Sequence, residues 1–177
     1  MKHAMIDIET LGLGIQVPLF EIGVCIFDLE QKAMISSHQI NVDLLDVVLK
    51  TGFTTQQGTV DWWRDQTYDP TQNKSRLTLT RALNRLDHLL TEAEVQMAWG
   101  NSPSFDMVII EQHYKALGRT PPWSYRQELD FRTLKWLHRD FLGREMPPVA
   151  DEKVSHNAER DAQQQTEVLL HMLGSFK

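Results

Sequence analysis

The chain has 177 residues, of which 41% are hydrophobic and 24% are charged, and its formal net charge is −6. That length and composition suit one globular domain with its own hydrophobic core, and they exclude a disordered or fibrous protein. The acidic balance argues against a protein that coats nucleic acid by long-range attraction, but it leaves open an enzyme that holds a strand end through cations and a few arginines.

The first part of the chain predicts three β-strands. Residues 4–8 are a short β-type run, residues 21–29 are a longer one, and residues 34–42 alternate more loosely. The polar stretch 28–32 predicts a turn between the second and third strands. A hairpin or meander is therefore expected to open the fold.

Further along, the apolar residues recur at helical spacing. Thr78 or Thr80 is available as N-cap of the first helix, and Gly118 and Gly143 stand where glycine favours the end of a later one. The predicted elements in chain order are helix 80–90, strand 95–99, and helices 105–117, 134–141 and 157–173.

The order β-β-β-α-β-α-α predicts an α/β fold in which helices flank a mixed central sheet. This order is compatible with a ribonuclease H-like fold. No repeat, low-complexity tract or linker interrupts the chain, so one domain over residues 1–177 is expected.

The sequence also predicts where the protein resides. Cys25 is the single cysteine, so an intramolecular disulfide is impossible, and a reducing compartment fits. The N-terminal residues reach Asp7 too early for a signal peptide. No apolar stretch approaches the roughly 20 residues that a membrane helix needs. We therefore expect a cytoplasmic protein with no membrane association.

Asp7 and Glu9 lie two residues apart in the first predicted strand. Side chains alternate between the faces of a strand, so these two acids project from the same face. Ile6 and Ile8 then enter the core. Paired carboxylates resist burial unless a hard cation such as Mg²⁺ or Mn²⁺ joins them. The alternative is a strand end that carries two solvated acids.

Two further acids lie beside predicted helix starts. Asp106 follows a strand, a turn and the segment 101–105, although an isolated acid there also suits the helix dipole. His156 stands at the start of the last helix, with Asp161 about a turn inside and Asn157 or Ser155 as the cap. Alone, such a histidine is more often a polar surface residue.

These residues indicate a specific chemistry only when they are considered together. Two metal ions about 3.5–4 Å apart can clamp a phosphodiester, and four carboxylates supply ligands for them. A histidine with a pKa near ~6.5 can take the proton from an attacking water.

Three segments resemble the exonuclease motifs of the DEDDh family, in the DnaQ-like, ribonuclease H-fold superfamily: residues 7–10, residues 101–106, and His156 with Asp161. The resemblance implies that two Mg²⁺ ions, replaceable by Mn²⁺, are held by four carboxylates, with Asp7 bridging both ions. It also implies that His156 is the general base. The implied metal ligands are Asp7, Glu9, Asp106 and Asp161, and together with His156 they form the catalytic set.

A narrower likeness involves residues 60–66, the segment 99–106 and residues 130–133. These blocks resemble phage DexA-type exonucleases and related small bacterial exoribonucleases. The implied activity is 3′-to-5′ removal of nucleoside 5′-monophosphates from single-stranded DNA or RNA 3′ ends, by one exonuclease domain over residues 1–177. The choice between DNA and RNA stays open, and a homodimer is expected because relatives often pair.

Substrate contacts are expected from four residues. The resemblance implies that Thr10 and Leu11 meet the terminal nucleotide, and Phe105, which precedes the third carboxylate, is placed to stack on a base. Trp62 and Trp63 are adjacent, so one is expected to pack inward and the other to border the groove. The sequence does not decide which of them does so, and Trp63 is taken as the substrate-binding candidate. A core or loop role is the alternative for each. Candidate phosphate contacts, each also a plausible surface ion-pair partner, are Arg64, Arg126 and Arg132.

Three other functions fit parts of this pattern. A non-catalytic nucleic-acid-binding module could retain the fold, since a fold does not imply activity. A ribonuclease H-type endonuclease would use the same two-metal chemistry but release internal fragments. A metal-dependent phosphatase would cleave monoesters and ignore oligomers. The set of four acids with a histidine favours the exonuclease, because binding an anion does not require acids.

Overall fold

A five-stranded mixed sheet forms the centre of the molecule, with the strand order β3-β2-β1-β4-β5. The structure is a computed structural model that describes residues 1–66, 75–147 and 156–174. Strand β1 pairs antiparallel with β2, and β2 with β3, whereas β4 and β5 run parallel to β1. The strands are β1 (Lys2–Thr10), β2 (Leu19–Asp28), β3 (Ala33–Asn41), β4 (Met97–Gly100) and β5 (Glu128–Asp130).

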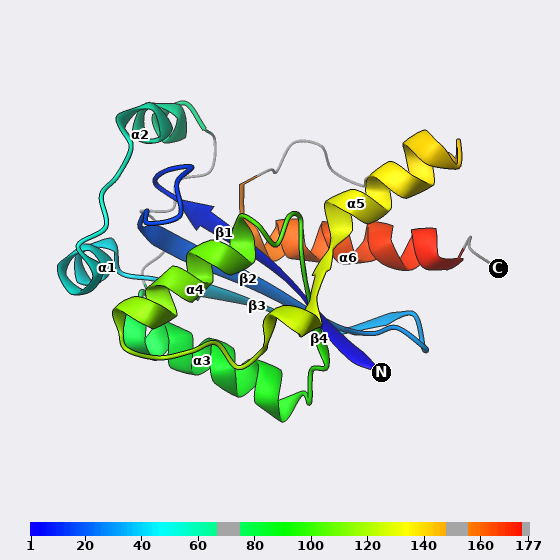
Figure 1. The fold of residues 1–177 in the computed structure, drawn as a ribbon, viewed down its shortest axis with the longest axis horizontal. Helices are drawn as coiled ribbons and strands as arrows, with labels where there is room; N and C mark the ends of the chain where they lie inside the picture. The colour runs from blue at the N-terminus through cyan, green and yellow to red at the C-terminus, as the bar shows by residue number, and fades with distance from the viewer. Residues whose placement is uncertain (67–74, 148–155, 175–177) are drawn as a thin grey trace.

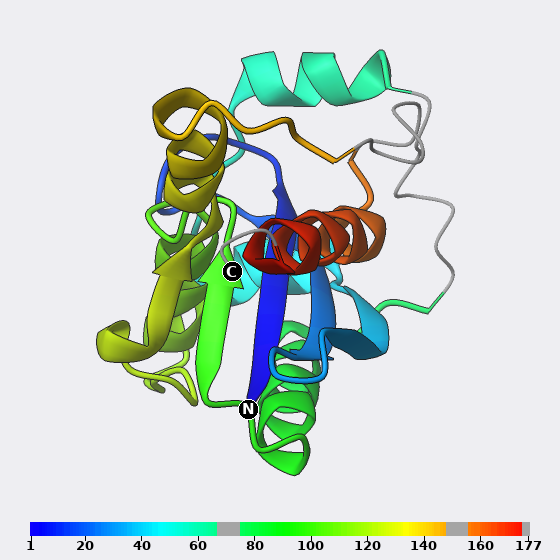
Figure 2. The ribbon, with the colours of Figure 1, turned by 90° about the vertical axis from the view of Figure 1, so that its right-hand side faces the viewer.

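Helices cover both faces of this sheet (Figures 1 and 2). The helices α3 (Leu79–Glu92) and α4 (Asp106–Ala116) pack on the face to which β1 contributes Ile6 and Ile8. The helices α5 (Phe131–Trp136) and α6 (Ala158–Gly174) pack on the other face. Apolar residues on both faces of β1 make it a buried central strand. Polar side chains on such a strand are unusual and need a structural or functional reason.

Two short helices follow β3 in the chain. The helix α1 (Leu44–Thr51) is capped by Asp43, whose Oδ1 accepts the Asp46 N–H at 3.1 Å. The helix α2 (Gln57–Arg64) has no side-chain cap. A 3-10 turn η2 (Tyr125–Gln127) precedes β5, and a π-helical segment η3 (Leu137–Phe141) follows α5. Within the described ranges, none of the helices is long and apolar enough to cross a bilayer.

The predicted mixed sheet with flanking helices is confirmed, and so are its three N-terminal strands. The helix predicted over 134–141 starts earlier, at Phe131, because the Asp130 carboxylate accepts the Arg132 N–H at 3.0 Å and caps it. Its last turn is π-helical. Strand β5 and helices α1 and α2 were not predicted.

Candidate active site

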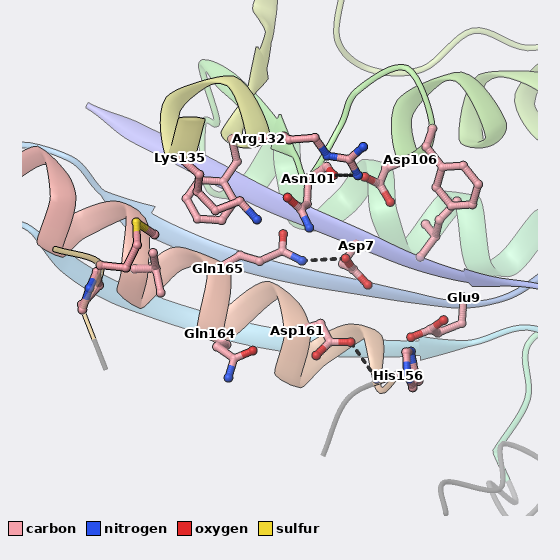
Figure 3. A pocket seen from close by; sticks show the side chains of 16 residues that line it. Asp7, Glu9, Asn101, Asp106, Arg132, Lys135, His156, Asp161, Gln164 and Gln165 are labelled. Atoms are coloured by element: carbon pink, nitrogen blue, oxygen red, sulfur yellow. Dashed lines mark hydrogen bonds between the residues drawn. The ribbon is translucent and has the colours of Figure 1, made fainter. Parts of the chain in front are cut away.

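The first three acids meet because β1 and β4 are parallel, in register from His3↔Met97 to Met5↔Trp99. Parallel strands bring their carboxyl ends to one edge of the sheet, where open α/β folds bind ligands. Asp7 and Glu9 lie near the carboxyl end of β1, and Asp106 begins the helix that follows β4 (Figure 3). Both Asp7 and Glu9 face the same cavity, as the strand alternation predicts.

The start of α6 brings the remaining two predicted residues to this edge. The Asn157 Oδ1 accepts the Arg160 N–H at 3.0 Å and caps the helix, while Ser155 lies outside the described residues. The His156 N–H donates to Asp161 Oδ2 at 2.9 Å. This bond closes the turn and holds both residues over the sheet edge (Figure 3).

A close contact with β2 fixes where α6 starts. The buried Glu21 Oε1 accepts the Ala158 N–H at 2.9 Å. Two residues further, a Cβ on Gly23 would lie 1.9 Å from the Ala158 carbonyl oxygen. Only glycine therefore lets the helix backbone approach the strand this closely.

All five predicted catalytic residues line one cavity of about 420 Å³. Oxygen or nitrogen ligand atoms of Glu9, His156 and Asp161 lie within 4.8 Å of one another. Asp7 accepts a hydrogen bond at 2.8 Å from Gln165 Nε2, which orients its carboxylate (Figure 3). The sequence prediction that distant acids converge is therefore met by the geometry.

The surroundings of the four acids shift their pKa values upward. Burial, followed by the charges of Asp106 and Asp161, raises the pKa of Asp7 well above its usual range. Burial and the neighbouring Asp7 raise the pKa of Glu9 to about 10. Burial raises the pKa of Asp106 to about 7 although backbone N–H groups, first that of Ser102, oppose the shift. Burial also raises the pKa of Asp161. Ionised together, these groups repel one another and require a cation.

The residues present fit divalent metal ions. Hard oxygen ligands on four acids match the preference of Mg²⁺ and Mn²⁺. Two further buried oxygens at the cavity, Asn101 Oδ1 and Gln165 Oε1, have no hydrogen-bond partner among the described residues. Such acceptors suit water molecules held around a hydrated cation.

A second, more apolar cavity of about 560 Å³ adjoins the first, and the two share Ile8, Glu9 and Phe105. Trp63 packs edge-on against Phe20 and its indole N–H donates to the Thr10 carbonyl at 3.0 Å. Trp62 is more open, at 41% exposure. The residues that complete this cavity include Thr10, Leu13, Gln56, Thr59, Trp62 and Trp63.

Three sequence candidates lie elsewhere. Leu11 lines neither of these two cavities, and both its backbone groups bond within the protein, to Pro18 O and Gln56 N. Leu13, which the sequence reading did not select, lines the apolar cavity instead. Arg64 pairs with Asp61 at 2.9 Å, and Arg126 lies over the Tyr125 ring.

Other cavity residues were missed, although spacing held a signal for them. Gln165 lies one turn after Asp161 on α6, so both project from the same face. Lys135 lies three residues after Arg132 on α5 and also lines the catalytic cavity. Neither residue type is diagnostic alone, which is why sequence reasoning did not select them.

Solved structures share this fold. Cell-death related nuclease 4 (CRN-4) matches with a TM-score of 0.72 and 13% identity, over 99% of this chain and 64% of that chain. A metal-free E. coli exonuclease I–ssDNA complex gives 0.68 and 13%, over 98% and 41%. The nuclease domain of 3′hExo, a DEDDh family member bound to rAMP, gives 0.66 and 11%, over 99% and 92%. The protein therefore has the ribonuclease H-like fold of the DEDDh exonucleases.

The sequence identifies the family itself. A profile of the 3'-5' exoribonuclease Rv2179c-like domain matches residues 2–173, so the chain belongs to that family. Comparison with curated proteins finds no significant match. The expected DEDDh resemblance is confirmed by these findings.

Proposed function

We propose that residues 1–177 form one exonuclease domain that removes nucleoside 5′-monophosphates from single-stranded 3′ ends by a two-metal mechanism. The observation that carries this proposal is the convergence of four acids and His156 in one cavity, beside an apolar cavity large enough for a nucleoside. Ligand sites of this kind combine apolar walls with a few convergent polar groups.

In this mechanism Asp7, Glu9, Asp106 and Asp161 hold two Mg²⁺ ions, with Mn²⁺ able to substitute. When bound, such ions neutralise the carboxylates, polarise the phosphate and favour deprotonation of an attacking water. Gln165 orients the Asp7 carboxylate, and the backbone of His156 orients Asp161. The chain thus sets the ligand directions before substrate arrives.

His156 is the proposed general base. Its ring lies edge-on to Trp62, with the ring centroids 4.4 Å apart, and has ligand atoms of Glu9 and Asp161 nearby. From this position the imidazole can accept the proton of a water directed at the phosphate. The proton then leaves to solvent through the open side of the cavity.

The terminal nucleoside is proposed to occupy the apolar cavity. Phe105 and Trp62 offer faces on which a base can stack, while Thr10 and Trp63 support the wall. Leu11 would contribute only by shaping the loop that carries Leu13. The family description favours RNA as the substrate, whereas one neighbour binds ssDNA and another a histone mRNA stem-loop.

A time course on 5′-labelled single-stranded RNA and DNA, with and without Mg²⁺, tests this function. We expect a ladder that shortens one nucleotide at a time and stops when the cation is chelated. Asp7→Asn is the matched inactive control. Internal fragments would indicate a ribonuclease H-type endonuclease, and binding without digestion would indicate a non-catalytic module. The homodimer and the cytoplasmic location stay predictions.

A further inference from the structure

The catalytic cavity continues past the acids, away from Glu9 and the apolar cavity. This extension lies between α5 and α6 (Figure 3). Its described walls include Arg132 and Lys135 from α5, Gln164 and Gln165 from α6, and Met146. The extension is thus the one part of the catalytic cavity, within the described residues, to which lysine and arginine side chains contribute.

Lys135 has no carboxylate partner within ion-pair distance among the residues that the structure describes. Its Nζ lies 4.8 Å from the centroid of the Phe131 ring. Burial, and then the charges of Arg132 and Arg139, lower its pKa. Two acids are equally near in sequence: Asp130 already accepts hydrogen bonds from the Arg132 N–H and the Thr133 hydroxyl, and Asp140 pairs with Arg139. Within the described part of the chain this half-buried ammonium has no carboxylate partner, and an anionic ligand would balance its charge.

Arg132 projects from the same side of α5, because residues three apart are neighbours on a helix. One of its guanidinium nitrogens donates to the Asn101 carbonyl at 2.8 Å. This bond fixes the guanidinium beside the Asp106 turn and leaves other N–H donors available. Both cations therefore line the catalytic cavity, Arg132 beside the Asp106 turn and Lys135 farther from the acids.

The order of features across the site indicates the direction in which a bound nucleic-acid strand would run. The apolar cavity lies at the Glu9 end, the four acids lie in the middle, and Lys135 lies at the far end (Figure 3). If the terminal nucleoside fills the apolar cavity and the scissile phosphate meets the acids, the next phosphate on the 5′ side reaches the α5 cations.

We propose that Lys135, assisted by Arg132, binds the phosphodiester on the 5′ side of the scissile one. This subsite rests on the proposed exonuclease function and deepens it, since it makes a second internucleotide phosphate part of the recognised substrate. Loss of one hydrogen bond to a charged group is expected to lower kcat/KM roughly 10-fold to 100-fold.

Two substrates separate this subsite from the catalytic centre. A tetraribonucleotide carries the upstream phosphate, whereas the 4-nitrophenyl ester of a nucleoside 5′-monophosphate carries only the scissile one. We expect Lys135→Gln to lose roughly 10-fold to 100-fold in kcat/KM on the tetranucleotide and to retain wild-type turnover of the ester. Lys135→Arg should restore tetranucleotide cleavage.

Lys115→Gln is the matched control, because Lys115 also sits on a helix but pairs with Glu111 at 3.0 Å and lines neither cavity. Lys115→Gln should cleave both substrates as efficiently as the wild type. A neutral methylphosphonate in place of the upstream phosphate should slow the wild type to the level of Lys135→Gln and should not slow that variant further. The slope of the logarithm of the binding constant against the logarithm of the salt concentration should decrease in magnitude by about 0.7 in Lys135→Gln.

Equal losses on both substrates would overturn the proposal and assign Lys135 a structural role through Phe131. Unchanged tetranucleotide cleavage by Lys135→Gln would also overturn it. If the wild type cleaved neither substrate, the proposed function itself would fail, which is a different result from either of these.

Discussion

His156 has a backbone φ of 74°, in the left-handed region that histidine seldom adopts. Such a conformation costs of order 1–3 kcal/mol and persists only where neighbouring contacts impose it. Here the contacts are the hydrogen bond from its N–H to Asp161 and the edge-on packing of its ring against Trp62 and Trp63. Together they fix the imidazole beside the carboxylates.

Replacing His156 with alanine tests its role as the base. We expect kcat to fall by about 10²-fold to 10⁴-fold while Mn²⁺ still binds, because the acids remain. Single-turnover kinetics and calorimetric titration with Mn²⁺ measure the two properties separately. Wild-type turnover in His156→Ala would remove this residue from the mechanism.

Trp62 is the exposed aromatic of the apolar cavity. Base–aromatic stacking is worth about 1–3 kcal/mol, so Trp62→Ala should raise KM roughly 5-fold to 150-fold. Trp62→Phe should retain most of the affinity. Trp136→Ala is the control, since Trp136 is 54% exposed and lines neither cavity. A similar KM for both alanine variants would show that Trp62 does not contact the substrate.

The convergence of the candidate catalytic residues could be predicted from the sequence because the proposed chemistry depends on residue type and order. Alternation in a strand placed Asp7 and Glu9 on one face, and parallel pairing then brought Asp106 to them. Substrate walls depend instead on loop paths. The turn after β1 exposes Leu13 at the cavity and engages the backbone of Leu11, and no local pattern distinguishes the two leucines.

Long, periodic elements were predictable for a similar reason. Helix α3 has leucines at every turn, and β2 is apolar along nearly its whole length. Strand β5 has three residues, too few for alternation to be visible, and α2 contains a glycine and two β-branched residues without a capping side chain. Tertiary contacts, rather than local preference, determine these elements.

The contact between β2 and α6 gives a prediction for the paired elements. Gly23→Ala would force its Cβ against the Ala158 carbonyl, so the start of α6 must move and carry Asp161 and His156 with it. We expect a lower melting temperature and a severe loss of activity, because about 1 Å of misplacement can cost 10²-fold. Thermal unfolding and exonuclease assays measure both.

Gly174→Ala provides the matched control on the same helix. Among the described residues its Cβ would meet the flexible end of the Lys32 side chain alone, 3.3 Å away. This variant should keep wild-type activity. Full activity in Gly23→Ala would show that the close approach of the helix is not needed for the site.

The stability of the whole molecule depends on the protonation of the acids in its active site. In the folded protein the pKa of Glu9 is about 10, against 4.5 for a free side chain, and the pKa values of Asp7 and Asp161 are also raised. A raised pKa means that the folded state favours the proton. The resulting stability is fully present below about pH 4.5 and is lost as the pH rises toward 10.

Metal binding should therefore stabilise the fold most at alkaline pH. We expect Mg²⁺ or Mn²⁺ to raise the melting temperature strongly near pH 8 and little near pH 5, where protons compete for the carboxylates. Asp7→Asn should weaken both the pH dependence and the metal effect. Differential scanning fluorimetry across this range measures it, and a metal shift independent of pH would contradict the assigned pKa directions.

The number of Mn²⁺ ions bound per chain, counted by electron paramagnetic resonance with a nucleoside 5′-monophosphate present, tests most directly whether the four acids hold a pair of cations at the scissile phosphate. The wild type is predicted to bind two ions, and Asp7→Asn to lose at least one of them with its activity. Equal Mn²⁺ binding by the two proteins, or none by the wild type, would contradict it.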